Sequence, residues 1–272
     1  MKIHALTLTW NGQDKLEKLS PTFFDATKDL NAEVIWYIRD NGSKDDTLKY
    51  LESEKERWGD NLKVLDAGHN RESFAGGVNS LWKMADVADD DIILMLNNDI
   101  IFNDTVSVQK ILDLHKKTKA DVVGCRLLFE NTTKLQHAGV IYSKKYGLMP
   151  FHYRPSEESD AEAEKDRYFQ SVTAAFCLVT GASFNKIGGM DEGFKWAFDD
   201  IDMCMQIRAN GGKIAYCGST NIYHEESATL KKNPVNKMFQ GPNVERFRKK
   251  WSGKYEIDHD LYLGNPSYNV IK

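Results

Sequence analysis

The chain has 272 residues, of which 41% are hydrophobic and 11% aromatic, so it can bury a full core in one large domain or two small ones. Lys and Arg number 36 against 40 Asp and Glu, and this formal net charge of −4 excludes a generally basic nucleic-acid coat protein. The four cysteines are widely spaced and form no Cys-x-x-Cys pair. Buried reduced thiols are therefore expected, rather than a zinc site or disulfides.

The N-terminal ten residues are too short and too polar for a signal peptide. No window approaches the roughly 18 apolar residues that a membrane-spanning helix needs. These features predict a cytoplasmic protein without a transmembrane segment.

The first hundred residues alternate between strand and helix patterns. Strands are expected at 3–9, 32–39, 62–65 and 92–96, and helical patterns follow Asn11-Gly12 and cover 45–58 and 73–88. This alternation predicts an α/β fold with a mostly parallel sheet that helices cover on both faces.

Polar turns follow three of these strands, at residues 9–11, 40–43 and 97–99. In parallel sheets ligands bind beyond the carboxyl ends of the strands, so these turns are expected to be neighbours. The apolar run 92–96 ends in Asn97-Asn98-Asp99, which can present a hard-oxygen metal ligand to a phosphate or can simply be a polar turn. Asp40, directly after a strand, can accept hydrogen bonds from a nucleobase or a ribose.

Three further segments carry unusual charge. Asp199, Asp200 and Asp202 open a helical pattern; the helix dipole explains one or two of these acids, and Asp202 is expected to face solvent or pair with Arg208. The segment 156–166 holds six acids and one Lys, which predicts a solvated, mobile loop.

The segment from Lys231 to Lys254 has eight Lys or Arg residues against one Glu, interleaved with aromatics. One interpretation is an amphipathic helix that docks by its aromatic side chains and shows its basic residues to water. The other is a platform for something anionic, such as a lipid-phosphate surface or a nucleic acid. The sequence leaves both open.

The ordered set of motifs resembles the family-2 glycosyltransferases of the GT-A fold. The matching segments are 7–12, 39–47, 70–79, 96–99, 180–183, 189–194 and 198–204, and together they span about residues 1–225. The resemblance implies a mixed, mostly parallel sheet flanked by helices, with a Rossmann-like nucleotide-binding half and an acceptor half. It also implies a glycosyltransferase domain at 1–225, with 226–272 as a basic, aromatic helical extension packed on it.

The same resemblance implies an inverting transfer from a nucleotide-diphosphate sugar, UDP- or dTDP-linked, to an acceptor hydroxyl. Asp200 would be the general base, and Asp99 with His224 would hold Mn²⁺ or Mg²⁺. His224 could instead be a surface or packed histidine, since imidazole is not the preferred ligand of Mg²⁺. The family's Asp-x-Asp motif is here Asn97-Asn98-Asp99, which leaves one anionic ligand. Donor-binding roles would fall to Thr9, Asn11, Asp40, Arg71, Asn79, Asn98, Gly181 and Asp199.

Gly181 also has a second interpretation, a close-packed strand-to-helix turn. Three alternative functions remain open: a sugar-phosphate nucleotidyltransferase, which normally needs a Gly-rich triphosphate loop, a dinucleotide oxidoreductase, and a non-catalytic nucleotide-sugar or glycan-binding module. The acceptor is undetermined, because a saccharide, a lipid carrier, a protein or a modified nucleic acid is compatible with one base and an open cleft.

Overall fold

The computed structural model describes residues 1–144, 149–195, 197–225 and 240–272. Its strands are β1 (Lys2–Thr9), β2 (Glu33–Asp40), β3 (Leu62–Asp66), β4 (Ile92–Leu96), β5 (Ile100–Phe102), β6 (Val122–Phe129), β7 (Leu135–His137), β8 (Val140–Ser143), β9 (Met149–His152), β10 (Arg167–Tyr168), β11 (Phe176–Thr180) and β12 (Ile214–His224). Its helices are α1 (Gln13–Thr27), α2 (Thr47–Ser53), α3 (Lys55–Trp58), α4 (Phe74–Ala85), α5 (Ser107–Thr118), α6 (Gly181–Ile187), α7 (Asp199–Ala209), α9 (Gln240–Trp251) and α10 (His259–Gly264).

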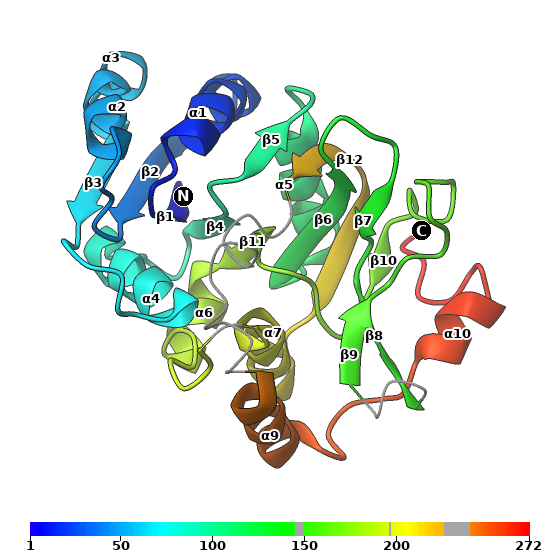
Figure 1. The fold of residues 1–272 in the computed structure, drawn as a ribbon. Coiled ribbons are helices and arrows are strands. Elements are labelled where there is room, and N and C mark those ends of the chain that lie inside the picture. Colours follow the sequence, from blue (N-terminus) through cyan, green and yellow to red (C-terminus); the bar gives the residue numbers. More distant parts are fainter. Residues whose placement is uncertain (145–148, 196, 226–239) are drawn as a thin grey trace.

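One large sheet organises the described part of the chain, with strand order β10-β12-β6-β11-β4-β1-β2-β3 (Figure 1). Strands β1 to β4 are mutually parallel where they pair, β11 runs antiparallel to both β4 and β6, and β12 is parallel to β6. The carboxyl ends of β1, β2, β4, β6 and β12 therefore share one edge with the beginning of β11. The predicted α/β fold with a mixed, mostly parallel sheet is confirmed.

Helices cover both faces of this sheet, as the strand and helix alternation predicts. On one face, buried apolar side chains of α1 and α5 pack against the strands, and on the other those of α4, α6 and α7 do so. All five residues of β4 are buried, because this central strand has helices on both sides. Burial of this continuous apolar run stabilises the middle of the sheet.

Two predicted helices differ from the observed ones. The helix expected at 45–58 is divided into α2 and α3 on either side of Glu54, whose buried carboxylate accepts hydrogen bonds from Ser20 and Arg57. The helix expected at 73–88 ends at Ala85, because Asp86 adopts a left-handed conformation with φ of 48°. Ser73 begins this helix as an N-cap, since its hydroxyl accepts a hydrogen bond from the Gly76 N–H.

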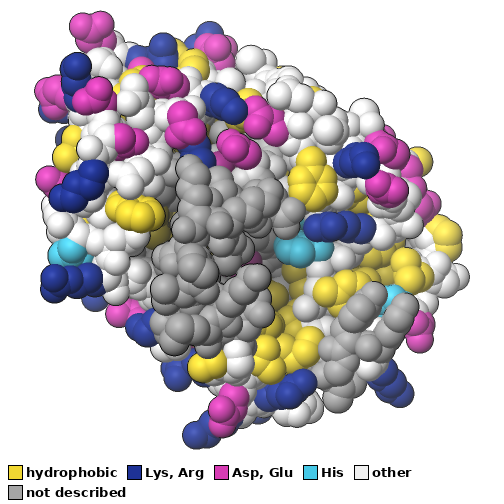
Figure 2. Space-filling view, in the orientation of Figure 1, with side chains coloured by type: hydrophobic (Ala, Val, Ile, Leu, Met, Phe, Trp, Pro, Cys, Tyr) yellow, Lys and Arg dark blue, Asp and Glu magenta, His cyan; other side chains and the backbone are white. Residues whose placement is uncertain are grey.

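All four cysteines are free and buried, which confirms the expectation of reduced thiols. Within the described ranges, no helix is both long and apolar enough to cross a membrane. On the face shown in Figure 2, acidic and basic side chains are interspersed along the upper edge, while hydrophobic side chains gather toward β8 and β9. Among the described residues of this face, charges of both signs thus lie close together along that edge.

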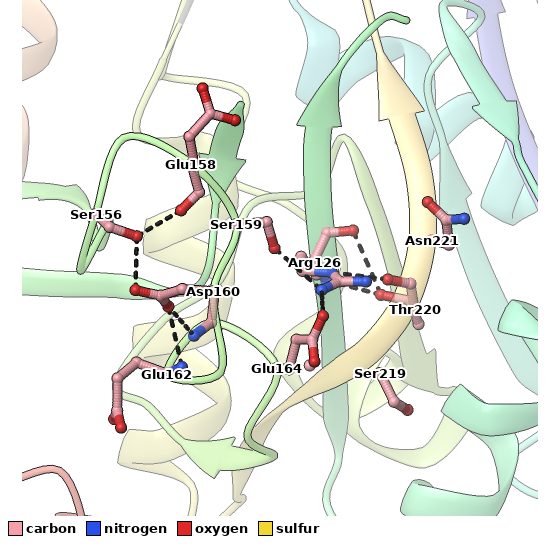
Figure 3. Close-up of polar contacts among 12 residues, drawn as sticks. Arg126, Ser156, Glu158, Ser159, Asp160, Glu162, Glu164, Ser219, Thr220 and Asn221 are labelled. Carbon is pink, nitrogen blue, oxygen red and sulfur yellow. Dashed lines mark hydrogen bonds and ion pairs between the residues drawn. The ribbon is translucent and has the colours of Figure 1, made fainter. Parts of the chain in front are cut away.

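The acidic segment 156–166, for which the charge predicts a solvated, mobile loop, is joined to the sheet by hydrogen bonds (Figure 3). Arg126 on β6 donates to the Ser159 hydroxyl at 3.0 Å and to the Glu164 carboxylate at 2.7 Å, and its Nε donates to the Thr220 carbonyl of β12. Ala163 is fully buried, and its carbonyl accepts the hydroxyl proton of a tyrosine on β12. The segment is tied to the sheet because a single buried guanidinium can bind several acceptors at once.

The structure also corrects the expectation for Asp202, which is fully buried rather than exposed to solvent. Its carboxylate accepts hydrogen bonds from Lys250 Nζ at 2.8 Å and from Trp251 Nε1 at 2.6 Å, and Arg208 instead donates to Gln170. Asp202 therefore joins α7 to α9. A buried carboxylate needs such partners to offset its desolvation.

The described part of the basic segment, 240–254, docks by its aromatic side chains. Phe247 and Trp251 are buried, and Arg246 and Lys250 form ion pairs with Asp191. This packing matches the first of the two interpretations of the segment. Its residues 231–239 lie outside the described ranges.

Replacement of Asp202 by Ala is expected to lower the free energy of unfolding by about 3 kcal/mol, because it leaves Lys250 and the Trp251 indole without their shared acceptor. Urea denaturation of the two proteins measures this loss. Asp260→Ala, at a carboxylate whose side chain is 97% exposed, is the control and should change stability by less than about 0.5 kcal/mol. Equal effects of the two substitutions would contradict the assigned role.

Candidate functional site

A cavity of about 350 Å³ lies at the sheet edge where β1 and β4 end and β11 begins. Six of the residues predicted for the site line it: Thr9, Asn98, Asp99, Asp199, Asp200 and His224. They come from four segments that are far apart in the sequence. The sheet alone brings most of them together, since the ends of its central strands share this edge.

The register of the central strands fixes the floor of the cavity. Leu6 of β1 pairs with Met95 of β4, and the Asn97 N–H donates to the Ala175 carbonyl at 2.9 Å. Asn98 Nδ2 then donates to the Thr9 hydroxyl at 3.0 Å, so the first and fourth strands are joined at their ends. Gly12 packs against this contact so closely that an added Cβ would lie 2.5 Å from the Thr9 hydroxyl.

Asp99 and His224 meet at one side of the cavity. His224 Nε2 lies 3.2 Å from Asp99 Oδ1, and Lys15 Nζ lies 3.9 Å from Asp99 Oδ2. The Glu225 N–H donates to the Asp99 carbonyl at 3.0 Å, which holds the end of β12 against the turn after β4. Asp99 Oδ1 is nevertheless buried and accepts no hydrogen bond from any described residue.

This pair has the donor chemistry of a divalent cation site. An unsatisfied carboxylate oxygen and an imidazole nitrogen suit Mn²⁺, which accepts both oxygen and nitrogen ligands, better than Mg²⁺. Among the described residues, no group of three or more His, Cys, Asp or Glu side chains is placed to hold a metal. Two protein ligands would leave coordination positions open for oxygens of a ligand.

Asp199 and Asp200 line the same cavity from the start of α7. Asp200 Oδ2 accepts the Ala174 N–H at 3.2 Å, and its Oδ1 accepts the Ile201 N–H at 2.8 Å. Asp199 is only 6% exposed, and its Oδ2 has no hydrogen-bond partner among the described residues. A buried carboxylate oxygen without a donor on the wall of a cavity can accept a hydrogen bond from a bound hydroxyl.

Burial raises the pKa of both carboxyl groups above the usual value for Asp. For Asp199 the charge of Asp200 raises the pKa further, whereas backbone N–H groups of Ile201 and Ala174 partly offset the shift at Asp200. The carboxylates of Asp199 and Asp200 thus bind a proton more readily than an ordinary Asp carboxylate does. This property suits a group that removes a proton from a hydroxyl.

The turn before these carboxylates is strained. Ala197 and Phe198 have φ angles of 78° and 70°, in the left-handed region that non-glycine residues rarely adopt. Helix α9 holds the turn, because Asn243 Nδ2 donates to the Ala197 carbonyl at 3.2 Å and the Phe198 ring packs against Phe247 at 5.3 Å between centroids. The position of Asp199 and Asp200 thus depends on a helix from the C-terminal part of the chain.

Asp40 and Asn11 do not line the cavity, although the neighbouring Asn41 does. Asp40 is fully buried; its Oδ1 accepts the N–H groups of Gly42 and Ser43, and its Oδ2 accepts the Ser43 hydroxyl. Asn11, with φ of 46°, accepts the Lys44 N–H with its side chain. Both residues shape the turns beside the cavity, and a contact of either with a nucleobase stays a prediction.

Three other residues predicted to bind the donor also do not line the cavity. Arg71 is exposed, and the side-chain amide of Asn79 forms hydrogen bonds with the Met190 backbone and the Glu192 carboxylate. Gly181 follows β11 at the opposite edge of the sheet, where an added Cβ would lie 2.1 Å from the Ala88 carbonyl. The interpretation of Gly181 as the floor of a sugar site is therefore wrong, and the close-packed turn is what the structure shows.

Sequence reasoning missed several residues of the cavity, including Trp10, Lys15, Glu72 and Thr173. The sequence pattern could have indicated Lys15, because this residue lies on the same helical face as Leu16 and Leu19. A lysine that points inward must face a partner or a ligand. Glu72 is held by Arg39, a residue 5% exposed whose guanidinium lies 2.9 Å from the Glu72 carboxylate. Nothing in the local pattern marks Thr173, because it precedes β11 in an irregular segment.

The sheet order, the Asp99 carboxylate beyond β4 and the acidic start of α7 define a GT-A-type α/β protein. A family model described as "Glycosyltransferase like family 2" matches residues 19–239, and the chain belongs to this family.

Among curated proteins, the O-antigen biosynthesis protein RfbC of Myxococcus xanthus is 26% identical over 261 residues, which cover 94% of this chain and 19% of RfbC. The chain thus spans about a fifth of the length of that relative.

Two solved structures share the fold. GalNAc-T7 with UDP, GalNAc and Mn²⁺ matches with a TM-score of 0.68 and 14% identity, over 96% of this chain and 57% of that one. The mannosyltransferase PcManGT from Pyrobaculum calidifontis, in complex with GDP-Man and Mn²⁺, matches with a TM-score of 0.65 and 12% identity, over 97% and 68% of the two chains.

The raised pKa of Asp199 predicts a pH-dependent effect of Asp199→Asn. The folded pKa lies above the unfolded one, so ionising this group costs the folded state more than the unfolded state, and the cost grows as pH rises between the two values. In the absence of divalent cations, the variant should gain about 1 kcal/mol or more over the wild type at pH 8 and little at pH 4. Urea denaturation at both pH values tests this, with Asp260→Asn as control. A pH-independent difference would contradict it.

Proposed function

We propose that this protein is an inverting glycosyltransferase that moves a sugar from a nucleotide-diphosphate donor to an acceptor hydroxyl by a single displacement. The observation that carries the proposal is that Asp99 with His224 and Asp200 line one cavity. A single displacement needs stabilisation of the departing diphosphate on one side of the sugar and a base on the other. The family assignment supports the same reaction class.

Asp200 is proposed as the general base. Its carboxylate would take the proton of the acceptor hydroxyl while that oxygen forms a bond to the anomeric carbon and the bond from this carbon to the diphosphate breaks. The Ala174 and Ile201 N–H groups hold the carboxylate in place, and its raised pKa favours proton uptake. Asp199, with its unpartnered oxygen, is proposed to contact a sugar hydroxyl.

Asp99 and His224 are proposed to hold Mn²⁺ or Mg²⁺. Such a cation, when bound, neutralises charge that develops on a leaving diphosphate. Lys15, 3.9 Å from Asp99 Oδ2, adds positive charge at the same place. Thr9, Asn98 and the turn of Asp40 would position the nucleoside, for which UDP or dTDP is proposed.

The acceptor stays open among a saccharide, a lipid carrier, a protein and a modified nucleic acid. A glycosyltransferase domain at 1–225 with 226–272 packed on it is the proposed organisation, and the contacts of α9 with α7 and with the turn before α7 support it. A non-catalytic nucleotide-sugar or glycan-binding module is the main competitor. Release of nucleoside diphosphate from UDP- and dTDP-sugars with Mn²⁺ would exclude that competitor.

Asp200→Asn should bind the nucleotide sugar as the wild type does but lose transfer by at least about 100-fold, since an amide cannot accept the acceptor proton. Donor binding is measured by calorimetry and transfer by release of nucleoside diphosphate. The matched control Asp260→Asn should retain full turnover. Near-normal turnover of Asp200→Asn would refute the assignment of the base.

Asp99→Ala should abolish the tightening of nucleoside diphosphate binding by Mn²⁺, because it removes the anionic ligand of the proposed cation. Calorimetry with and without Mn²⁺ measures this difference, and EDTA should reverse it in the wild type. If EDTA leaves the wild-type affinity unchanged, the cation proposal is wrong.

A further inference from the structure

Gln136 on β7 contacts His224 twice, although it does not itself line the cavity. Its side chain is 4% exposed; Nε2 donates to the His224 carbonyl at 3.0 Å, and Oε1 lies 2.6 Å from His224 Nδ1. One amide group therefore holds both the backbone and the ring of the same histidine.

These two contacts fix which ring nitrogen carries the proton. A carbonyl oxygen only accepts hydrogen bonds, so the amide nitrogen of Gln136 must face it and the amide oxygen must face Nδ1. An amide oxygen cannot donate, so Nδ1 must carry a hydrogen. In the neutral imidazole the lone pair then lies on Nε2.

A second acceptor lies close to Nε2. Nε2 is 3.2 Å from Asp99 Oδ1, the buried oxygen that accepts no hydrogen bond from the described residues. Two acceptors held at this distance repel each other unless a positive charge lies beside both of them. The arrangement thus favours a positive charge shared by the two atoms, which is either a proton on Nε2 or a bound cation that replaces this proton.

Gln136 is itself held firmly. Arg154 Nε donates to its carbonyl at 2.6 Å, and β7 is paired to β6, which in turn pairs with β12 up to His224 itself. The neighbouring His137 is fully buried and its Nε2 accepts the Gly139 N–H at 3.2 Å. The amide of Gln136 therefore has a fixed direction, as an orienting group requires.

We propose that Gln136 is a positioning residue that fixes His224 in the Nδ1–H tautomer, so that Nε2 and Asp99 Oδ1 together can bind a divalent cation. The inference rests on the proposed function, in which Asp99 and His224 hold that cation. It assigns a specific task to a residue outside the cavity.

The tautomer is tested directly by ¹⁵N NMR of the metal-free protein, labelled at its seven histidines, at a pH where imidazole is neutral. His224 is assigned from the signal missing in His224→Ala. The wild type should show the proton on Nδ1 and the bare nitrogen shift on Nε2, and Gln136→Leu should lose this preference. A wild-type His224 protonated on Nε2, or an unchanged tautomer in Gln136→Leu, would overturn the proposal.

Cation affinity is tested by Mn²⁺ titration without donor or acceptor. Gln136→Leu should bind Mn²⁺ about 10- to 100-fold more weakly than the wild type, as loss of an orienting partner typically does. Gln136→Glu keeps an acceptor for the Nδ1 hydrogen but loses the donor to the His224 carbonyl, so its affinity should lie between those of Gln136→Leu and the wild type. In a His224→Ala background, Gln136→Leu should have no further effect, and an additive loss would overturn the proposal.

Gln170→Leu is the matched control. Gln170 is another buried glutamine, 5% exposed, but its amide contacts Asp258 and the Glu256 carbonyl, and it does not line the cavity. This variant should lose stability and keep wild-type Mn²⁺ affinity; equal weakening in both variants would mean that Gln136 acts only on folding. Failure of the wild type to bind Mn²⁺ would overturn this inference, whereas failure to release nucleoside diphosphate from any sugar donor would count against the proposed function.

Discussion

The cavity depends on the direction of one strand. β11 runs antiparallel between β4 and β6, so it begins at the edge where both of these neighbours end. The hydrogen bond from the Asn97 N–H to the Ala175 carbonyl fixes this junction at 2.9 Å, and the bond from the Glu225 N–H to the Asp99 carbonyl attaches the end of β12 beside it. If β11 ran parallel instead, residues 173–175 would lie at the far edge, and Asp200 would lose the Ala174 N–H that holds it.

The acidic side chains that line the cavity have different surroundings. Asp99 lies near the Lys15 ammonium group, at 3.9 Å, and the His224 ring, at 3.2 Å. Asp199 and Asp200 are buried beside each other, and burial raises both pKa values. Asp99 and the neighbouring Lys15 thus suit a bound cation or anion, whereas Asp199 and Asp200 suit the uptake of a proton. All three acids nevertheless line the same small cavity.

Much of the fold could be predicted from the sequence, because apolar periodicity is a local property. The strand at 92–96 is observed with the expected bounds, and the α/β alternation correctly indicates helices on both faces of the sheet. The site was harder to predict. Asp40 and Gly181 follow strands as ligand-binding residues do, but Asp40 uses its carboxylate within its own turn and Gly181 lies at the opposite edge, because β11 runs antiparallel. The direction of a strand, like the contacts of Asp202 and Arg126, is set by distant segments that no local pattern reveals.

The strained turn at Ala197 and Phe198 links the cavity to helix α9 through Asn243 and Phe247. Relaxed to ordinary dihedral angles, this turn would swing the two following carboxylates away from the sheet edge. Exchange of the segment that carries α9 for that of a relative would therefore also move the carboxylates that line the cavity, unless α7 is transferred together with α9.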